Sequence, residues 1–335
     1  MKSFGWKQIL LALAGFGLIV LALVVVKAVP QDVLAQIWQK GLTRPAGWRN
    51  ILKESTPLIL LGCSVYLALR VGLFNIGADG QFVIGACCAT VAALKFPGPT
   101  GIVAGIIAGI LGGALWAYPV GLIKAYRGGH EVITTIMLNN IAGFLTFYLV
   151  SGPIMDPTGQ QPSTATIADS AQLPMLIQDG PFRVSSATLI AVMAVAGLWW
   201  YLSRTVGGFE LSATGKNSNT ARFAGIAVEK VTVRAMAASG AIAGLAGAVQ
   251  VLAFEHRFYA HFSPGYGFDA LGVALLAGGN PLATAASGLL FGFISESTSI
   301  LGRTGVPKSL SSILLGVLVI VFAAYRYRKE AIVRD

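Results

Sequence analysis

Charged side chains are scarce in this chain of 335 residues, where Asp, Glu, Lys and Arg together make up only 11%. Soluble domains carry about 25% charged residues, whereas 55% of this chain is apolar. The scarcity of charge excludes an ordinary soluble domain and indicates an integral membrane protein. The formal net charge of +10 is scattered over short loops and helix ends. It therefore does not indicate a nucleic-acid-binding surface.

Residues that carry chemistry are also few. The three cysteines, Cys63, Cys87 and Cys88, lie in apolar segments without the spacing of a metal site or a disulfide framework. His256 and His261 have no Cys cluster or carboxylate pair beside them, so we interpret them as interfacial histidines. The sequence has no phosphate-binding loop and no Gly-x-Ser-x-Gly elbow. We expect no enzyme activity in this chain, no catalytic residue, no metal and no cofactor.

Long uncharged segments recur along the chain, and about 20 residues suffice to cross a ~30 Å hydrocarbon core at 1.5 Å per residue. Ile9 to Val26 is uncharged for 18 residues. We interpret it as a retained first helix rather than a cleaved signal peptide, because no clear small-residue cleavage site follows. Four further spans are predicted at Gly101 to Ile123, Val132 to Ser151, Val184 to Ser203 and Ala235 to Phe254.

Three apolar stretches are short or interrupted. Pro57 to Leu69 and Phe82 to Leu94 flank the Gly-rich segment Gly72 to Gln81, and neither is a comfortable full span. Ala270 to Ser295 is broken by Gly278 to Pro281, so we predict a hairpin of two helices there.

The segment Pro30 to Lys53 is polar and basic, and its apolar residues recur at helical spacing around Trp38. We predict an interfacial amphipathic helix for it. Its basic residues would then lie on the outer side, against the usual enrichment of Lys and Arg in the cytoplasm.

The predicted fold is an all-α integral membrane protein with about ten transmembrane helices in two inverted five-helix halves, some of them short or interrupted. We expect a single domain, 1–335, with a first half of about 1–152, an external loop 153–183 and a second half of about 184–335. The loop 203–234 is placed in the cytoplasm by its basic residues, Arg204, Lys216, Arg222, Lys230 and Arg234. The external loop is acidic, and both termini are predicted to be cytoplasmic.

Within the cytoplasmic loop, a short helix is expected through Ala221 to Ala224, capped by Asn219 or Thr220 and ended by Gly225. Charge alone leaves open that such a loop contacts only water and lipid headgroups. The segment GKNSNTARFAGI, however, resembles the loop that membrane subunits of ABC importers insert into their ATPase. In nucleoside and simple-sugar permeases this loop carries a pattern that matches Gly215, Asn217, Ala221, Arg222, Phe223, Ala224, Gly225 and Ile226.

Three more segments resemble the same permease family. GLFNIGADGQ, Gly72 to Gln81, matches a signature with Asp79 where a Glu is usual. GGHEVITTIMLNNIA, Gly128 to Ala142, resembles a segment of nucleoside permeases, with His130 replacing an Asn. Gly265 to Thr284 resembles a fourth signature. The resemblance implies a permease subunit of an ATP-driven importer in a bacterial inner membrane, surrounded by membrane lipid. It also implies three kinds of protein partner: ABC ATPase subunits, a second permease subunit and an external substrate-binding protein.

Polar residues inside apolar spans would cost several kcal/mol if they faced lipid. They therefore face protein, water or solute, and hydrogen bonding between helices remains an alternative to solute contact. Interrupted segments at matching places in inverted halves also point to a midplane path. The candidate path residues are Phe74, Asn75, Asp79, Asn139, Asn140, Gln250 and Asp269.

The resemblance is closest to nucleoside permeases, and amides beside an aromatic face suit a nucleoside. Simple sugars and branched-chain amino acids are the alternative cargoes. A different class also stays open, an ion-coupled secondary transporter that uses Asp79, Asp269 or Glu296 as proton or sodium sites.

Overall fold

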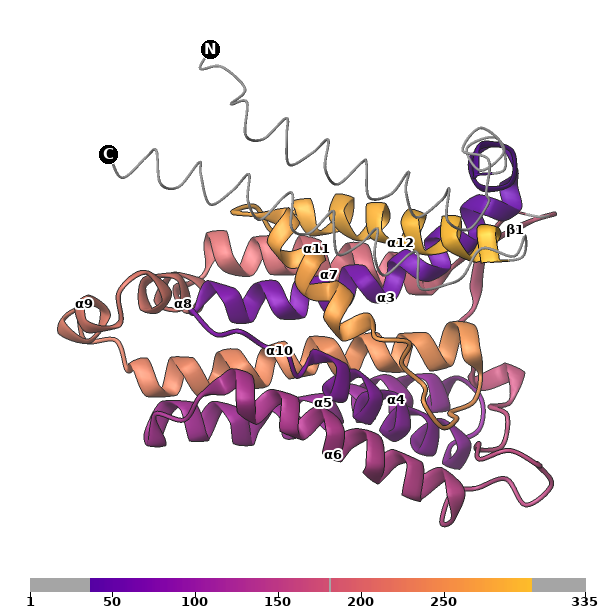
Figure 1. The fold of residues 1–335 in the computed structure, drawn as a ribbon, viewed down its shortest axis with the longest axis horizontal. Coiled ribbons are helices and arrows are strands. Elements are labelled where there is room, and N and C mark those ends of the chain that lie inside the picture. Colours follow the sequence, from indigo (N-terminus) through magenta and orange to yellow (C-terminus); the bar gives the residue numbers. More distant parts are fainter. Residues whose placement is uncertain (1–36, 181, 303–335) are drawn as a thin grey trace, which may run out of the picture.

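The computed structural model describes residues 37–180 and 182–302 and is built mainly of long, roughly parallel helices (Figure 1). Five helical segments in the described part are long and apolar enough to cross a membrane. They are α3 (Pro45–Arg70), α5 (Pro99–Arg127), α6 (Glu131–Ser151), α7 (Ser186–Arg204) and the segment Val228–Glu255, formed by α10 (Val228–Gln250) and the π-turn η3 (Val251–Glu255).

Shorter elements complete the described fold. They are η1 (Ile37–Leu42), α4 (Ala78–Lys95), the 3₁₀ turn η2 (Asp169–Ala171), β1 (Met175–Asp179), β2 (Phe182–Ser185), α8 (Val206–Lys216), α9 (Ser218–Phe223), α11 (Tyr266–Ala277) and α12 (Ala283–Gly302). The antiparallel pair β1 and β2 is a small exception to the all-α expectation. The predicted first span, Ile9 to Val26, and the predicted cytoplasmic termini lie outside the described residues, so the ten-span count and the inverted halves stay predictions.

Glycines let α5 lie directly against α10. In α5 the buried Gly101, Gly105, Gly109 and Gly113 recur every fourth residue. A Cβ added to Gly113 would collide with the carbonyl oxygen of Gly240, and one added to Gly244 would collide with that of Gly109. Small residues at this spacing allow helix backbones to approach closely where apolar burial supplies no driving force between helices. The α5 and α10 helices with α4 therefore form a tightly packed core.

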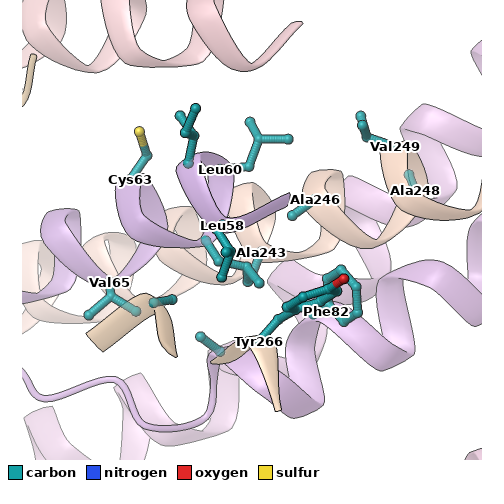
Figure 2. Packing of buried hydrophobic residues seen from close by; sticks show 14 of the residues in the cluster. Leu58, Leu60, Cys63, Val65, Phe82, Ala243, Ala246, Ala248, Val249 and Tyr266 are labelled. Carbon is teal, nitrogen blue, oxygen red and sulfur yellow. The ribbon is translucent and has the colours of Figure 1, made fainter. Parts of the chain in front are cut away.

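Aromatic rings hold the chain after α10 against α4. Phe82 on α4 lies edge-on to Tyr266 with ring centroids 5.9 Å apart, and Phe258 stacks on Phe262 at 4.9 Å. Figure 2 shows Phe82 and Tyr266 beside Leu58 and Ala243 in this cluster. Such pairs stabilise beyond their buried area by about 0.5–1.5 kcal/mol. The cluster fixes the loop between η3 and α11.

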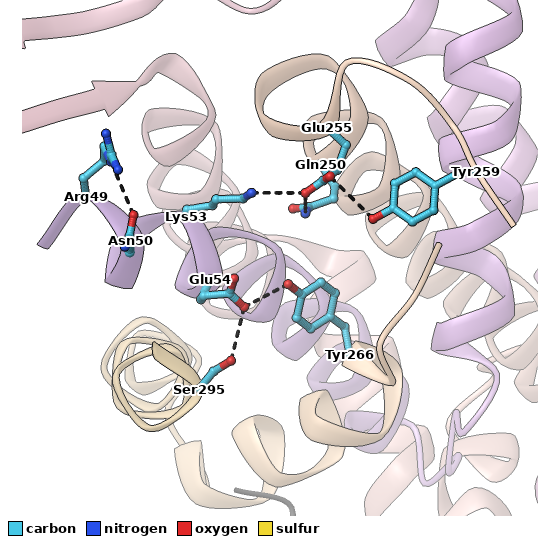
Figure 3. Close-up of polar contacts among 9 residues, drawn as sticks. All are labelled: Arg49, Asn50, Lys53, Glu54, Gln250, Glu255, Tyr259, Tyr266 and Ser295. Carbon is cyan, nitrogen blue, oxygen red and sulfur yellow. Dashed lines mark hydrogen bonds and ion pairs between the residues drawn. The ribbon is translucent and has the colours of Figure 1, made fainter. Parts of the chain in front are cut away.

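The interfacial prediction for Pro30 to Lys53 is wrong for residues 45–53, which form the first turns of the 26-residue span α3. Pro45 occupies the first helical position, where its missing N–H costs nothing. Polar residues of these turns have distant partners: Lys53 pairs with Glu255 at 3.1 Å, and the hydroxyl of Tyr266 donates to Glu54 at 2.9 Å (Figure 3). The apolar run Pro57 to Leu69 is thus the second part of a full-length span.

The remaining predicted segments lie close to their expected places. Helices α5, α6 and α7 coincide with predicted spans to within a few residues, and the apolar stretch Ala270 to Ser295 divides at Gly278 into α11 and α12. The loop 203–234, which the sequence places in the cytoplasm, contains more helix than expected, because α8 occupies its first part and α10 begins at Val228.

Candidate functional site

A cavity of about 450 Å³ lies between the start of α4, the middle of α6 and the loop that leads into α11. Small-molecule sites in proteins commonly measure roughly 300–1,000 Å³. Three of the predicted path residues, Asp79, Asn139 and Asn140, line this cavity. The structure thus brings residues of α4 and α6, which are far apart in the sequence, to the same cavity.

Asn139 also holds α4 against α6. Its Nδ2 donates to the carbonyl oxygen of Ile76 at 2.9 Å, and its Oδ1 accepts from the backbone N–H of Gly80 at 2.9 Å. A Cβ on Gly80 would come within 2.8 Å of that same Oδ1. The glycine therefore permits the close approach, and the amide satisfies two backbone groups at the start of the helix.

Asp79 joins the two Gly-rich segments that the sequence places at matching positions. Its Oδ1 accepts from the hydroxyl of Ser263 at 2.6 Å and from the backbone N–H of Gly267 at 3.0 Å. The second bond satisfies a donor in the first turn of α11, where a carboxylate is also favoured by the helix dipole. Gly267 packs so closely on Asp79 that a Cβ there would collide with the Asp79 backbone.

The cavity is also lined by aromatic side chains. Phe144 lies four residues after Asn140, and Phe147 lies three residues after Phe144, which places all three on one face of α6. The Phe144 side chain is 77% exposed. His261 lies 6.1 Å from the ring of Phe147, measured between ring centroids, and has a positive φ of 59°. The cavity therefore offers amide, carboxylate and imidazole groups beside apolar rings.

Four predicted path residues do not line this cavity. Asn75 is fully buried and donates to Gln81 and to Ser239, each at 2.8 Å. Gln250 is buried on α10, with its Nε2 3.4 Å from Glu255 (Figure 3). Phe74 is half exposed in the turn before α4, and Asp269 lies on the first turn of α11. Asn75 has a hydrogen bond to a neighbouring helix, to Ser239 on α10, which is the alternative that the sequence left open. The Gln250 contact stays within its own segment, Val228–Glu255.

The predicted docking segment, Gly215 to Ile226, lies at one end of the helices, and β1 lies at the other (Figure 1). Helix α9 begins two or three residues earlier than expected, because Asn217 and not Asn219 or Thr220 is the cap, and it ends at Phe223 instead of Ala224. The Asn217 Oδ1 accepts from the backbone N–H groups of Asn219 and Thr220, both at 3.0 Å. Gly225 has a φ of +82°, as expected for the residue that ends the helix.

The side chains of α9 divide by role. Ala221 is buried, and Phe223 is 94% exposed at the tip of the protein. Arg222 is exposed and pairs with Glu229 on the first turn of α10. Glu229 and the backbone bond from Ile226 to Ala221 tie α9 to α10. Phe223 is thus a large apolar side chain that projects from α9 into the surroundings.

Gly215 connects this docking segment to the main bundle. A Cβ at Gly215 would collide with the carbonyl oxygen of Arg70, the last residue of α3. Gly72 follows two residues later and opens the turn that leads to α4 and the cavity. The docking segment is thus in contact with the end of α3, only a short turn away from the residues that position Asp79 and Asn139.

Sequence reasoning missed the residues that complete the cavity, Phe144, Thr146, Phe147, His261, Phe262 and Ser263. The spacing of Asn140, Phe144 and Phe147 along one helix face was a usable signal. No local pattern indicated the loop residues, because the contact between Asp79 and Ser263 spans 184 positions.

Comparison with known proteins gives the same assignment as the sequence signatures. The family model described as the permease component of branched-chain amino acid transport systems matches residues 48–323. A glucose ABC transporter permease protein of Haloferax volcanii is 32% identical over 96% of this chain and 88% of its own length. No solved structure was found to match the chain.

Two further relatives carry nucleoside names. A guanosine ABC transporter permease protein of Bacillus subtilis is 34% identical over 82% of this chain and 80% of its own length. A nucleoside ABC transporter permease protein of Lactococcus lactis is 29% identical over 84% of this chain and 80% of its own length. The chain is therefore a multi-pass membrane protein that belongs to the family of ABC transporter permease subunits of the branched-chain amino acid, nucleoside and sugar type.

Proposed function

We propose that this chain is the permease subunit of an ATP-driven nucleoside importer and that the cavity beside α6 forms part of the solute path. The observation that carries the proposal is the meeting of Asn140, Asp79 and the phenylalanine rings of α6 around one cavity of about 450 Å³. A nucleoside presents hydroxyl groups on its ribose and a flat aromatic base. Amide, carboxylate and imidazole groups suit the first, and Phe144 and Phe147 suit the second.

Relatives named for guanosine and for glucose have similar identity to this chain, 34% and 32%. Sequence identity therefore does not choose between the two solutes. We favour the nucleoside because three phenylalanine rings line the cavity, whereas the described lining includes no Lys or Arg that would pair with the carboxylate of an amino acid. A hydrogen bond contributes about 1 kcal/mol, so a few contacts suffice for a path that must also release its cargo.

The cavity lies beside a face of α6 that is exposed in the part of the chain that the structure describes. Ile133, Met137, Ile141 and Phe144 on α6 are exposed and apolar, whereas Thr135, Ala142 and Thr146 face the core. Such a face contacts either lipid or another protein. We propose that a second permease subunit faces α6, so that the solute path runs between the two subunits.

ATPase subunits would bind at α9, with Phe223 as the apolar anchor. Closure of the ATPase pair would push α9, then the end of α8 at Gly215, and through Arg70 the turn that carries α4. Because Asn139 and Asp79 hold the start of α4 and of α11, this movement would change the cavity. The external substrate-binding protein would dock at the opposite end, near β1 and β2.

Uptake by the assembled transporter tests this function. The permease would be expressed with its ATPase and binding-protein partners and reconstituted in vesicles containing ATP. We expect labelled guanosine to accumulate and unlabelled nucleosides to compete for its uptake. Accumulation of glucose or leucine without entry of guanosine would contradict the nucleoside assignment. Transport driven by an ion gradient without any ATPase would contradict the permease mechanism as a whole.

Orientation is tested separately by cysteine labelling in a variant that lacks the three native cysteines. Thr166 and Ser218 are both exposed, and they belong to the predicted external and cytoplasmic loops. An impermeant maleimide added to intact cells should label Thr166→Cys and not Ser218→Cys. The reverse pattern would invert the proposed topology.

A further inference from the structure

A second pocket, of about 290 Å³, lies between the first turns of α3 and α7 at the end of the bundle opposite α9. Three basic side chains line it: Arg49 and Lys53 from α3, and Arg183 from β2. The sequence singled out the basic residues of the segment ending at Lys53, because they oppose the usual charge distribution. The structure brings two of them together with a third basic residue from a distant loop.

The charge in this pocket is only partly neutralised. Lys53 pairs with Glu255 at 3.1 Å. Among the described residues no carboxylate forms an ion pair with Arg49 or Arg183, and the Nε of Arg49 donates only to the side chain of Asn50, at 3.3 Å. Two guanidinium groups therefore remain available to an anion, and the planar donors of Arg suit phosphate oxygens in particular.

The pocket lies at the level where the spans end. Arg49 and Lys53 are in the first turns of α3, and Ser185 is the N-cap of α7, so both spanning helices begin beside it. Trp48 is exposed next to Arg49, and its indole N–H donates to the carbonyl oxygen of Leu42 at 2.9 Å. Tryptophans are enriched at the depth of the lipid headgroups. This position favours a membrane lipid over a soluble anion.

The rest of the lining suits an amphipathic ligand. Leu52, Met175 and Phe254 supply apolar surface beside the basic groups. His256 also lines the pocket, and its Nδ1 is buried without a hydrogen-bond partner among the described residues. Burial lowers the pKa of His256, so the ring is neutral near pH 7 and adds no charge. An uncharged imidazole can exchange a hydrogen bond with a hydroxyl of a headgroup.

We propose that this pocket binds the phosphate headgroup of an anionic phospholipid, with Arg49 and Arg183 on the phosphate. The lipid would bridge the first turns of α3 and α7 at the membrane surface. This site is separate from the solute cavity, and its assignment does not depend on which solute the transporter carries.

Lipid retention tests the site. The assembled transporter is purified from membranes or nanodiscs that contain phosphatidylglycerol and phosphatidylcholine, and the retained lipids are extracted and quantified by mass spectrometry. We expect the wild type to enrich phosphatidylglycerol, and Arg49→Gln with Arg183→Gln to reduce this enrichment roughly thirtyfold, since each basic residue near an anionic surface contributes about 1 kcal/mol and about 1.4 kcal/mol is a factor of ten. Arg49→Lys with Arg183→Lys keeps both positive charges and should therefore keep most of the enrichment.

Arg257→Gln is the matched control, because Arg257 is exposed at the same end but lines a different pocket. It should leave the enrichment unchanged. Equal retention of the two lipids by the wild type, or full enrichment in the double Gln variant, would overturn the proposal. Inorganic phosphate is the alternative ligand, and it is tested by thermal unfolding of the delipidated transporter. If phosphate raises the melting temperature of the wild type but not of Arg49→Gln with Arg183→Gln, the site binds a free anion and the lipid assignment is overturned. If Arg49→Gln with Arg183→Gln keeps its lipid but no longer associates with the binding protein, the pocket binds an acidic protein surface and the lipid proposal is overturned.

Discussion

Helices α5 and α6 follow each other in the chain but pack in opposite ways. The buried glycines of α5 bring its backbone against α10, and α4 closes on the same pair. Helix α6 attaches to α4 mainly through Thr135, Asn139 and Ala142, and it leaves most of its apolar side chains exposed. Backbone packing of this kind tolerates almost no displacement, whereas a helix held by a few polar contacts, those of Asn139 and the ion pair of Glu131 with Lys124, can shift. We propose that α5 and α10 form the fixed frame, and that α6 is the element that can respond to cargo and partners.

A substitution that forces α5 and α10 apart should have the largest effect, a loss of folded protein. Gly244→Val places a branched side chain against the backbone of α5, where a Cβ alone would already collide with Gly109. Overpacking a core costs typically 1–3 kcal/mol and occasionally more, and here backbone atoms would have to move. We expect little folded protein by size-exclusion chromatography of the detergent-solubilised variant.

Gly197→Ala on α7 is the matched control, because no heavy atom lies within 4 Å of a Cβ built there. Ala is also favoured over Gly inside a helix by about 1 kcal/mol. The control should therefore fold with unchanged or slightly higher thermal stability. Normal yield of Gly244→Val would show that α5 and α10 are not the rigid frame.

Substitutions in the docking segment should strongly reduce transport and leave the fold intact. Gly225→Val forces a β-branched residue into a φ of +82°, and Arg222→Glu places two carboxylates where the ion pair with Glu229 stands. Backbone strain of this kind costs about 1–3 kcal/mol, enough to displace a six-residue helix. We expect uptake near background, reduced copurification of the ATPase, and a melting temperature close to that of the wild type.

Lys230→Gln removes an exposed positive charge from the same surface without touching the ion pair, and it should keep ATPase copurification. If both docking variants transport normally, α9 is not the site at which the ATPase acts.

Substitutions of Asn139 and Asn140 on α6 should have a smaller effect, which differs between the two residues. Asn139→Leu removes both hydrogen bonds to the start of α4, and leaving buried backbone groups unsatisfied costs about 1–3 kcal/mol. Asn140→Leu removes only a bond to Ile136 in its own helix. We expect thermal unfolding to shift for Asn139→Leu alone, and uptake to fall in both variants. Equal melting temperatures for the two would show that Asn139 does not hold α4.

Much of this architecture could be predicted from the sequence because its signals are local. Uniform apolar runs located α5, α6 and α7, and glycine after a short polar helix located the end of α9. The start of α3 could not be predicted, since Lys53 and Glu54 look like surface residues until their partners Glu255 and Tyr266 are known. Those partners lie about 200 positions further along the chain. Local periodicity carries no information about such pairs.

The cavity shows the same limit. Asp79, Asn139 and Asn140 could be selected as polar residues in apolar surroundings, but Asn75 and Gln250 fit that criterion equally well and are buried outside the cavity. A polar residue in a span must find a partner, and the sequence does not say whether that partner is a helix or a solute. Only the folded arrangement separates the two groups.

The most direct test of α6 as the solute-facing element compares alkylation at two exposed apolar positions. Phe144→Cys on α6 lies in the cavity, and Val103→Cys on α5 lies on the surface of the fixed frame. Each is made in the assembled transporter lacking the native cysteines, and its maleimide labelling rate is measured with and without guanosine. We predict that guanosine slows labelling of Phe144→Cys and leaves Val103→Cys unchanged. Equal rates at Phe144→Cys with and without guanosine, in a transporter that still accumulates guanosine, would contradict the placement of the solute path beside α6.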